Sequence, residues 1–543
     1  MAVDSQKFIE LLESGYANLE NNKQSVNDLN VFPVPDGDTG TNMALTMLSA
    51  VREAENSTGG VGEIALSVSS GALMGARGNS GVILSQLLRG FAKGCMGSVN
   101  MSPDVLAKAL GTAKEAAYNA VMKPTEGTIL TVARVMSEFA EANVDKYTDP
   151  AEYVSELVKA GEKALDETPE MLPVLKEAGV VDAGGAGLMC IMKGVLAALE
   201  GNPVRLKDSK GPGVTAQFDS TVNSDIKFAY CTELLIRTDG KKQYRKQLID
   251  KLMKIGDSLL VIEDSGIIKI HVHSNEPWNV MKTASAAGEF IRIKIENMKE
   301  QHNEIFGEMD ENEADDGSIR PDEAPTDYAV IAVSPGKGFD EILRGLGVNY
   351  IISGGQTMNP STQQFIDIIE KTNARDYILL PNNKNIIMAC NQARDVSKKN
   401  VHVLETKNMP QAITALMSFD PSQAADFNIK NMTEAFSVVR TAQVTFAVRD
   451  TTVGGVDVHK DDVIGIIDGE IVSAGRDVDA AASEIVDKLI EEPAGLVSLY
   501  YGDNVTPEEA EALKARIAAK YPEVDFEAID GGQPLYYYII SAE

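Results

Sequence analysis

The chain has 543 residues, too many for one hydrophobic core, so roughly two to four domains are expected. Its formal net charge is -30, from 80 acidic and 50 basic residues, which argues against a nucleic-acid-binding surface and against attraction to anionic lipid. Four cysteines without paired spacing, a polar N-terminus and the lack of any apolar run of about 18 residues predict a cytoplasmic protein without disulfides or a transmembrane segment.

Residues 1–205 follow the helical hydrophobic period almost throughout. The first apolar stripe consists of Phe8, Leu11, Leu12, Tyr16 and Leu19. Another helix is expected to start at Ser102-Pro103, because proline suits the first helical position. Convincing strands are absent, so these helices must bury their stripes against one another. The pattern predicts an all-α domain, built as a bundle or a ring of helices.

One stretch of this domain, Asn30-Val-Phe-Pro-Val-Pro-Asp-Gly-Asp-Thr-Gly-Thr-Asn42, indicates a metal and phosphate site. Asp36 and Asp38 stand two residues apart on a turn interrupted by glycine, and a helix is expected directly afterwards, with Thr39 or Thr41 as its cap. Carboxylates beside free N–H groups at a helix start suit Mg²⁺ that carries a polyphosphate. A surface turn is nevertheless the commoner fate of a lone Asp-Gly-Asp sequence.

A second glycine-rich turn, Gly75-Ala-Arg-Gly-Asn-Ser-Gly81, favours the metal and phosphate site over a plain surface turn. An apolar helical run follows this turn too, as it follows the first. The backbone N–H groups of the turn and the Ser80 hydroxyl could cradle phosphates, and the residues concerned are Gly78, Asn79, Ser80 and Gly81. The turn is not a Walker loop, because no Gly-Lys-Ser/Thr follows.

Residues 206–307 change pattern and predict a small α+β middle domain after a linker at Leu206–Gly213. The expected order is strand, helix, strand, strand, helix. The corresponding segments are Phe228–Ile236, Lys241–Ile255, Leu259–Ile262, Ile267–His273 and a long helix over Trp278–Phe306.

Three residues of this middle domain form a candidate zinc site. His271 and His273 are two apart in a strand and therefore share a face, and Cys231 lies in a strand of the same domain. Two imidazoles and a thiolate suit Zn²⁺ with one open position. The alternative without a metal is that the two histidines are simply half-buried polar residues of a strand. His302 is a weaker candidate ligand for the same site.

Residues 308–326 hold eight acidic residues and almost no apolar content, which predicts a flexible acidic linker. Residues 327–543 predict an α/β domain with a parallel sheet, starting with a buried strand at Tyr328–Val333. The Ser334–Gly338 segment is explained by a strand-to-helix turn, because a single Gly-Lys-Gly is weak evidence for a phosphate loop. The Ser353–Ser361 segment is a possible binding loop.

Four motifs together resemble the ATP-binding L domain of dihydroxyacetone kinase, and the whole chain resembles the A subunit of bacterial fatty acid kinase. The motifs are Asn30–Asn42, Gly75–Gly81, Glu126–Arg134 and Val181–Gly187. The resemblance implies that the helical domain is an antiparallel barrel with nucleotide at one mouth. It also implies a C-terminal domain with a DegV-like fold, which recruits partners without holding a lipid itself, and a homodimer.

The resemblance also implies roles for single residues. The dihydroxyacetone kinase pattern has three aspartates. Asn30 stands near the position of the first one, and the spacing is one residue longer here than in that pattern. Asn30, Asp36 and Asp38 are therefore the expected Mg²⁺ ligands. Thr39 and Asn42 are further candidates for nucleotide binding. Thr128 and Asp182 are assigned to it by the resemblance alone, and the alternative for Asp182 is a helix cap. The resemblance favours a metal or catalytic role for Cys231, His271 and His273.

The expected function is that of a kinase component that binds ATP and Mg²⁺. The resemblance implies that it phosphorylates the carboxylate of a fatty acid presented by a separate lipid-binding B subunit, giving an acyl phosphate. A kinase for a dihydroxyacetone-like small molecule is a second hypothesis, although no counterpart of the acceptor domain with its covalent-binding histidine is visible. A third is a non-catalytic, nucleotide-responsive scaffold, against which the intact Asp36 and Asp38 argue.

Overall fold

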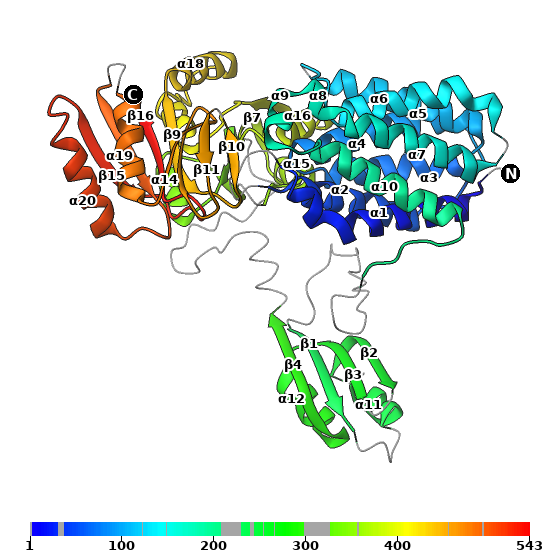
Figure 1. Cartoon of the computed structure of the whole chain (residues 1–543). Coiled ribbons are helices and arrows are strands. Elements are labelled where there is room, and N and C mark those ends of the chain that lie inside the picture. The colour runs from blue at the N-terminus through cyan, green and yellow to red at the C-terminus, as the bar shows by residue number, and fades with distance from the viewer. Residues whose placement is uncertain are drawn as a thin grey trace. The chain divides into compact units, whose positions relative to one another are not determined.

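The structure of the chain is a computed structural model (Figure 1). It describes residues 3–30, 37–121, 123–147, 149–207, 230–238, 244–252, 255–264, 267–297, 326–355, 358–453, 455–490 and 494–543. For some residues between 230 and 297, Cys231, His271 and His273 among them, only the backbone is described. The chain divides into two compact units, one formed by Met1–Lys207 with Ser318–Glu543 and the other by Asp208–Gly317.

The first part of the first unit is helical, as predicted. Its helices are α1 Ser5–Asn27, α2 Thr39–Glu55, α3 Val61–Gly75, α4 Gly78–Cys95, α5 Pro103–Ala120, α6 Ile129–Asn143, η1 Val144–Lys146, α7 Pro150–Asp166, α8 Thr168–Met171, α9 Pro173–Ala178 and α10 Ala183–Leu199. The predicted start at Ser102-Pro103 is confirmed, since the Ser102 hydroxyl accepts the Val105 N–H and Pro103 is the first helical residue.

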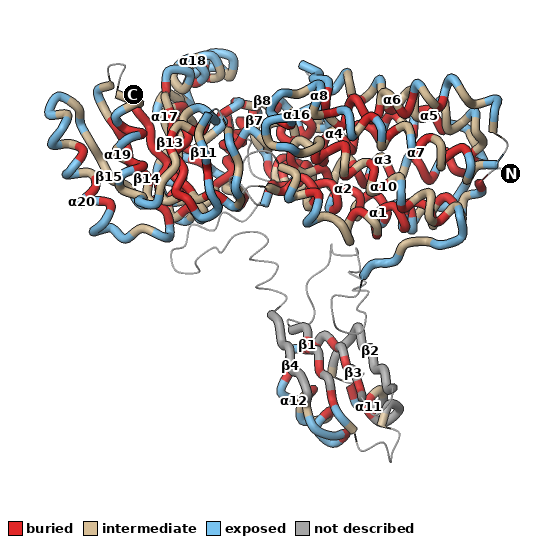
Figure 2. The backbone as a smooth tube through the Cα atoms, viewed as in Figure 1, coloured by how far each residue is buried: buried red, intermediate tan, exposed pale blue. Residues whose placement is uncertain are grey.

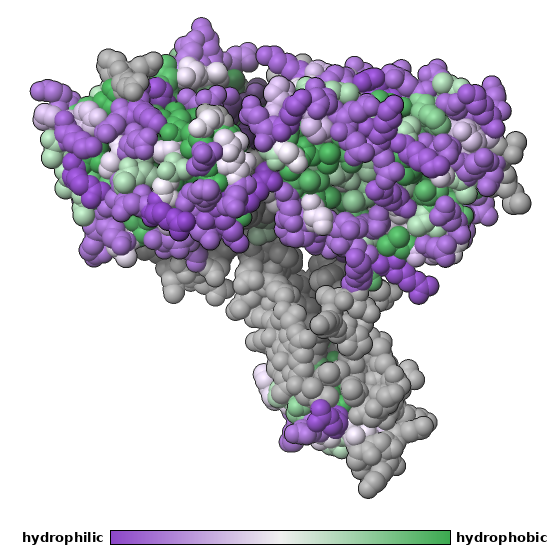
Figure 3. Space-filling model, in the orientation of Figure 1, coloured by the Kyte–Doolittle hydropathy of each residue, from purple (hydrophilic) through white to green (hydrophobic). Residues whose placement is uncertain are grey.

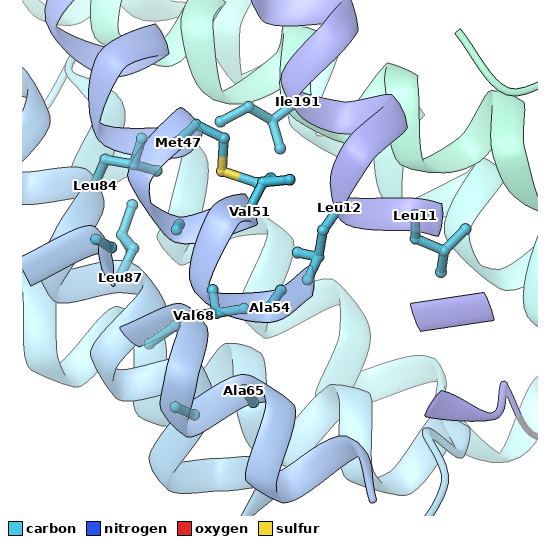
Figure 4. Close-up of a cluster of buried hydrophobic side chains, with 14 of the residues drawn as sticks. Leu11, Leu12, Met47, Val51, Ala54, Ala65, Val68, Leu84, Leu87 and Ile191 are labelled. Carbon is cyan, nitrogen blue, oxygen red and sulfur yellow. The ribbon is translucent and has the colours of Figure 1, made fainter. Parts of the chain in front are cut away.

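Consecutive long helices from α1 to α7 contact one another, and α10 contacts both α7 and α1, so the sequence of contacts closes on itself. The apolar faces meet inside, where the buried segments of Figure 2 gather. Figure 4 shows part of this core, which α1, α2, α3, α4 and α10 build from Leu11, Leu12, Met47, Val51, Ala54, Ala65, Val68, Leu84, Leu87 and Ile191.

The helices enclose a cavity of about 160 Å³. Its lining is almost wholly apolar and includes Phe8, Leu12, Met47, Leu87 and Met136. None of the described residues that line it is charged, so this cavity does not suit a phosphate or a metal ion.

The C-terminal part of the first unit contains two larger sheets, and the α/β expectation is confirmed. The parallel sheet has the order β6-β5-β7-β8, and the mixed sheet has the order β13-β12-β9-β16-β14-β15. The strands are β5 Thr326–Ser334, β6 Tyr350–Ser353, β7 Ala374–Leu380, β8 Asn400–Val403, β9 Arg440–Phe446, β12 Val463–Ile467, β13 Glu470–Gly475, β14 Leu496–Tyr501, β15 Asp525–Asp530 and β16 Tyr538–Ala542, with a hairpin of β10 Thr451–Val453 and β11 Val456–Val458.

Helices cover both faces of the parallel sheet, which explains the unbroken apolar run of β5. Val330 and Ala332 face one core, and Ile331 and Val333 face the other. The helices of this part are α14 Lys337–Gly345, α15 Thr362–Lys371, α16 Ile387–Val396, α17 Met409–Met417, α18 Ala425–Ser437, α19 Val478–Leu489 and α20 Pro507–Ala518. In the view of Figure 3, hydrophilic residues cover most of the surface of this unit.

The second unit is a small α+β structure with a four-stranded antiparallel sheet of order β2-β3-β1-β4. Its elements are β1 Tyr230–Arg237, α11 Arg245–Leu252, β2 Gly256–Asp264, β3 Ile267–Ser274, α12 Pro277–Ala284, η2 Ser285–Ala287 and β4 Glu289–Asn297. Alternate residues of β1 and β3, such as Leu234, Ile268 and Ile270, form a core with the two helices.

The expectation of one long helix over Trp278–Phe306 is wrong. Helix α12 ends at Ala284, and β4 pairs with β1 after Gly288, whose φ of +153° ends the helical turns. Residues 290–296 read Phe-Ile-Arg-Ile-Lys-Ile-Glu, which has the alternation and the β-branched residues of a strand. The linker predictions lie outside the described residues, apart from residues 206–207 and from Thr326, which begins β5.

Among the helices that the structure describes, none is long and apolar enough to cross a membrane.

Candidate active site

The second glycine-rich turn joins α3 to α4 through Ala76 and Arg77. Gly78, the first residue of α4, has φ +55°, and a Cβ on it would lie 2.5 Å from Nδ2 of Asn42. Any larger residue would therefore meet both backbone strain and a steric clash. No described side chain caps the start of α4, so its first N–H groups are available for an anion.

Asp38 directly precedes α2 and is buried, with 9% of its surface exposed. Its carboxylate does not cap its own helix. Instead, Oδ2 accepts a hydrogen bond from Nδ2 of Asn359, which belongs to the C-terminal part of the same unit. The backbone carbonyl of Asp38 accepts the Asn42 N–H at 2.8 Å, which begins the helix.

The first and second turns meet through side chains as well. The Thr39 hydroxyl donates to Oδ1 of Asn30 at 2.9 Å, and the Ser80 hydroxyl lies 3.5 Å from the Thr39 hydroxyl. Three of the predicted site residues thus form one chain of polar contacts, and Asn42 touches Gly78 beside it. Asp36 lies in residues 31–36, outside the described part of the chain.

Two amide oxygens near this cluster provide a test of whether a cation fits. Oδ1 of Asn79 and Oδ1 of Asn359 are buried, and neither has a hydrogen-bond partner among the described residues. The Nδ2 of Asn79 donates to Oδ1 of Asn385 at 3.3 Å, also across to the C-terminal part. Buried oxygens of this kind, together with the Asp38 carboxylate, are the hard ligands that Mg²⁺ prefers.

Thr128 and Asp182 occupy the starts of two other helices. Thr128 accepts the Leu130 N–H at the start of α6, and Asp182 accepts the Gly185 N–H at 2.7 Å at the start of α10. Burial raises the pKa of Asp182 to about 6, although hydrogen bonds from the backbone of Gly185, Ile129 and Gly184 oppose the shift. Asp182 thus does cap α10, as the alternative interpretation holds. The role of Asp182 in nucleotide binding stays a prediction.

In the second unit, the strand register brings the predicted zinc residues to neighbouring positions. Cys231 of β1 pairs directly with His273 of β3, and Glu233 pairs with His271. These positions alternate with the buried positions of the same strands, so they belong to the other face of the sheet. The sequence does not predict the pairing of Glu233, because sequence alone does not give the register.

The candidate metal site itself remains a prediction. No group of three or more His, Cys, Asp or Glu side chains that could hold a metal is found where side chains are described. The side chains of Cys231, His271 and His273 fall outside that part, and His302 lies in residues 298–325, which are not described.

Sequence reasoning misses the contributions of Arg77 and Asn359. The Arg77 guanidinium donates to the Asn359 carbonyl at 3.0 Å, and burial lowers its pKa. Asn359 belongs to the Ser353–Ser361 segment, which the sequence indicates as a possible binding loop without pointing to its partner. At Ser334–Gly338 a strand-to-helix turn is found, and Gly338 packs against the backbone of Asp530.

Comparison with known protein families accounts for most of the chain. Residues 33–197 match the DAK2 domain family. Residues 227–305 match the middle-domain family of proteins like the A subunit of fatty acid kinase, and residues 329–543 match the C-terminal family of the same proteins.

Curated relatives match over the full length. Protein YloV of Bacillus subtilis (strain 168) is 43% identical over 552 residues, covering 100% of this chain and 99% of the relative. An uncharacterized protein of Staphylococcus saprophyticus is 40% identical with the same coverage. Among solved structures, the Streptococcus pneumoniae fatty acid kinase B3 protein loaded with linoleic acid matches 40% of this chain and 99% of its own, at 12% identity. The TM-score of this match is 0.29.

The three family matches follow one another along the chain. The relative at 43% identity matches the chain over its full length and agrees with them. The chain belongs to the family of proteins like the A subunit of fatty acid kinase.

Proposed function

We propose that the chain is the ATP-binding subunit of a fatty acid kinase. A carboxylate oxygen of the fatty acid bonds to the γ-phosphorus of ATP, the bond from that phosphorus to the bridging oxygen breaks, and ADP and an acyl phosphate result. The observation that carries the proposal is the contact between Asn42 and Gly78, because it joins the two glycine-rich turns into one site. Phosphoryl transfer depends mostly on positioning and charge stabilisation, which such a site can supply.

The residues divide into two groups within this site. Asp38, with Asp36 and Asn30, would hold Mg²⁺, which neutralises charge on the polyphosphate when bound. The start of α4 would hold phosphate oxygens through the N–H groups and the hydroxyl of Gly78, Asn79, Ser80 and Gly81. Thr39, Asn42, Thr128 and Asp182 would complete the nucleotide site. The closed sequence of helix contacts supports the inference that the helices form a barrel with this site at one end.

The acceptor would come from outside the chain. The family match supports a separate lipid-binding B-type protein that presents the fatty acid, and the C-terminal part of this chain would recruit it. The second unit would act near the acceptor through Cys231, His271 and His273, with or without Zn²⁺, a role that the strand register supports. We expect a homodimer, which light scattering of the full chain tests.

The experiment that tests this function measures ATP turnover by the full chain with three acceptors. These are a B-type protein loaded with fatty acid, the same protein without lipid, and dihydroxyacetone. We expect turnover, with formation of acyl phosphate, only with the loaded protein. Turnover with dihydroxyacetone alone would favour a small-molecule kinase, and ATP binding without turnover in any arm would favour a scaffold.

A further inference from the structure

Asn359 connects the C-terminal part of the first unit to the predicted Mg²⁺ ligand Asp38. The residue is 1% exposed, and its Nδ2 donates to Oδ2 of the Asp38 carboxylate. The same nitrogen lies 3.3 Å from the position that a Cβ on Gly78 would take. The Asn359 amide is therefore close both to the carboxylate and to the first residue of α4.

The backbone around Asn359 is fixed independently of its side chain. The Arg77 guanidinium holds the Asn359 carbonyl at 3.0 Å, Arg77 forms an antiparallel bridge with Ser361, and the Thr362 N–H donates to the Ala76 carbonyl at 3.1 Å. The side chain of Ser361 also caps α15. Contacts with the second glycine-rich turn thus set the backbone position from which the Asn359 side chain reaches Asp38.

A further buried contact holds the same two parts together. Gln392 of α16 donates to the Ser85 hydroxyl of α4 at 3.1 Å, and its Oε1 accepts the hydroxyl of Thr362 at 3.1 Å. These three residues are buried. Since α4 is held here and at Arg77, the backbone of Asn359 cannot move far from Asp38 without loss of several hydrogen bonds.

We propose that Asn359 is a positioning residue of the nucleotide site, so that the C-terminal part completes a site otherwise built by the helices. A metal-binding carboxylate needs a hydrogen-bond donor that fixes its orientation, and Asn359 supplies this donor to Asp38. The Oδ1 of Asn359, buried in the same place without a partner among the described residues, gives the amide a second polar group for the bound Mg²⁺–ATP. This inference rests on the proposed function, because it needs Asp38 to bind Mg²⁺.

The test measures the ATP dissociation constant of the full chain at a series of Mg²⁺ concentrations, with no acceptor present. For Asn359→Ala we expect the Mg²⁺ concentration that gives half-maximal binding to rise by about 10–100-fold. Binding at saturating Mg²⁺ should stay within a few-fold of wild type. In the Asp38→Asn background, Asn359→Ala should shift the Mg²⁺ requirement much less than it does in the wild type, because most of its effect passes through Asp38 and only the part due to its Oδ1 remains.

Asn428→Ala is the matched control. Asn428 is also fully buried in the C-terminal part, but its side chain bonds to the Asp420 backbone, at 2.9 Å and 2.7 Å, and not to the site. Its replacement should lower the stability without changing the Mg²⁺ dependence. If Asn359→Ala does not fold, Asn359→Ser introduces a smaller polar side chain that is too short to reach Asp38, and it should give the same shift.

The outcomes separate this inference from the proposed function. If Asp38→Asn raises the Mg²⁺ requirement and folded Asn359→Ala or Asn359→Ser leaves it unchanged, the role of Asn359 is overturned and the site stands. If Asp38→Asn itself changes nothing, the Mg²⁺ site is wrong and this inference fails with it. Fully additive effects of the two substitutions would also contradict a role through Asp38.

Discussion

Gly78 and Asn42 approach each other so closely that a Cβ on Gly78 would lie 2.5 Å from the Asn42 amide nitrogen. Gly78 is the first residue of α4, and Asn42 lies in the first turn of α2. Each of the two helices starts at one of the two glycine-rich segments of the sequence. Their contact turns two separate motifs into one candidate site. The clash and the positive φ at Gly78 also make this position a sensitive probe of that site.

Gly78→Ala should weaken ATP binding strongly, because the methyl group pushes the Asn42 side-chain amide away from the start of α4. Gly97→Ala is the matched control, since Gly97 has φ +78° but a Cβ on it meets no described atom within 4 Å. Both variants should lose about 1–2 kcal/mol of unfolding free energy to backbone strain. Calorimetric ATP titration of both variants is the measurement. Equal ATP affinities in the two would show that the contact with Asn42 has no part in nucleotide binding.

Asp182 should make the unfolding free energy depend on pH. Its pKa of about 6 in the folded state exceeds the ordinary 3.8, so protonation favours the folded state. This contribution is fully present below about pH 4 and is lost as the pH rises through 6. Relative to Asp182→Asn, the wild type should therefore lose at most about 3 kcal/mol between pH 4 and pH 7. Denaturant unfolding of both proteins at several pH values checks this, and parallel pH profiles would refute it.

The Cys231, His271 and His273 cluster should affect the acceptor reaction and spare nucleotide binding. A variant in which any one of these three residues is replaced by alanine should bind ATP normally and fail to make acyl phosphate. His459→Ala, which removes an exposed histidine of the C-terminal part, should behave like wild type.

Metal analysis of the purified protein decides how this cluster works. If Zn²⁺ is bound, its affinity should fall as the pH falls, because the thiolate of Cys231 must be deprotonated. Lost activity in a metal-free protein would instead indicate that the histidines act directly. Retained activity in all three variants would reduce the cluster to polar residues on a small sheet.

Local patterns predict the parts of the fold that depend on local chemistry. Ser102-Pro103 starts a helix and the run at Tyr328–Val333 is a buried strand, because capping and burial act within a few residues. The strand at Glu289–Asn297 is missed, although Phe290 to Glu296 alternate, because the helical pattern of the preceding residues extends up to Gly288. The break at that glycine is the available signal.

Only the residues of the site that belong to the two glycine-rich segments can be predicted from the sequence. Asp38 and Gly78 stand in recognisable turns, and their neighbourhood follows from the packing of α2 and α4. Asn359 lies 321 residues after Asp38, and no periodicity or spacing connects the two. Its segment is conspicuous for Gly354 and Gly355, but only the fold reveals that it meets Arg77.

The most direct test of the proposed kinase site compares Asp38→Asn with Asp145→Asn in the full chain. Both substitutions remove one negative charge, but Asp38 is buried in the site and Asp145 is exposed in η1. The measurement is acyl phosphate formation at saturating ATP and Mg²⁺ with a B-type protein loaded with fatty acid. Asp38→Asn should lower the rate by about 100-fold or more with the fold intact, and Asp145→Asn should match wild type. A folded Asp38→Asn protein with the wild-type rate would contradict the assignment of Asp38 to the kinase site.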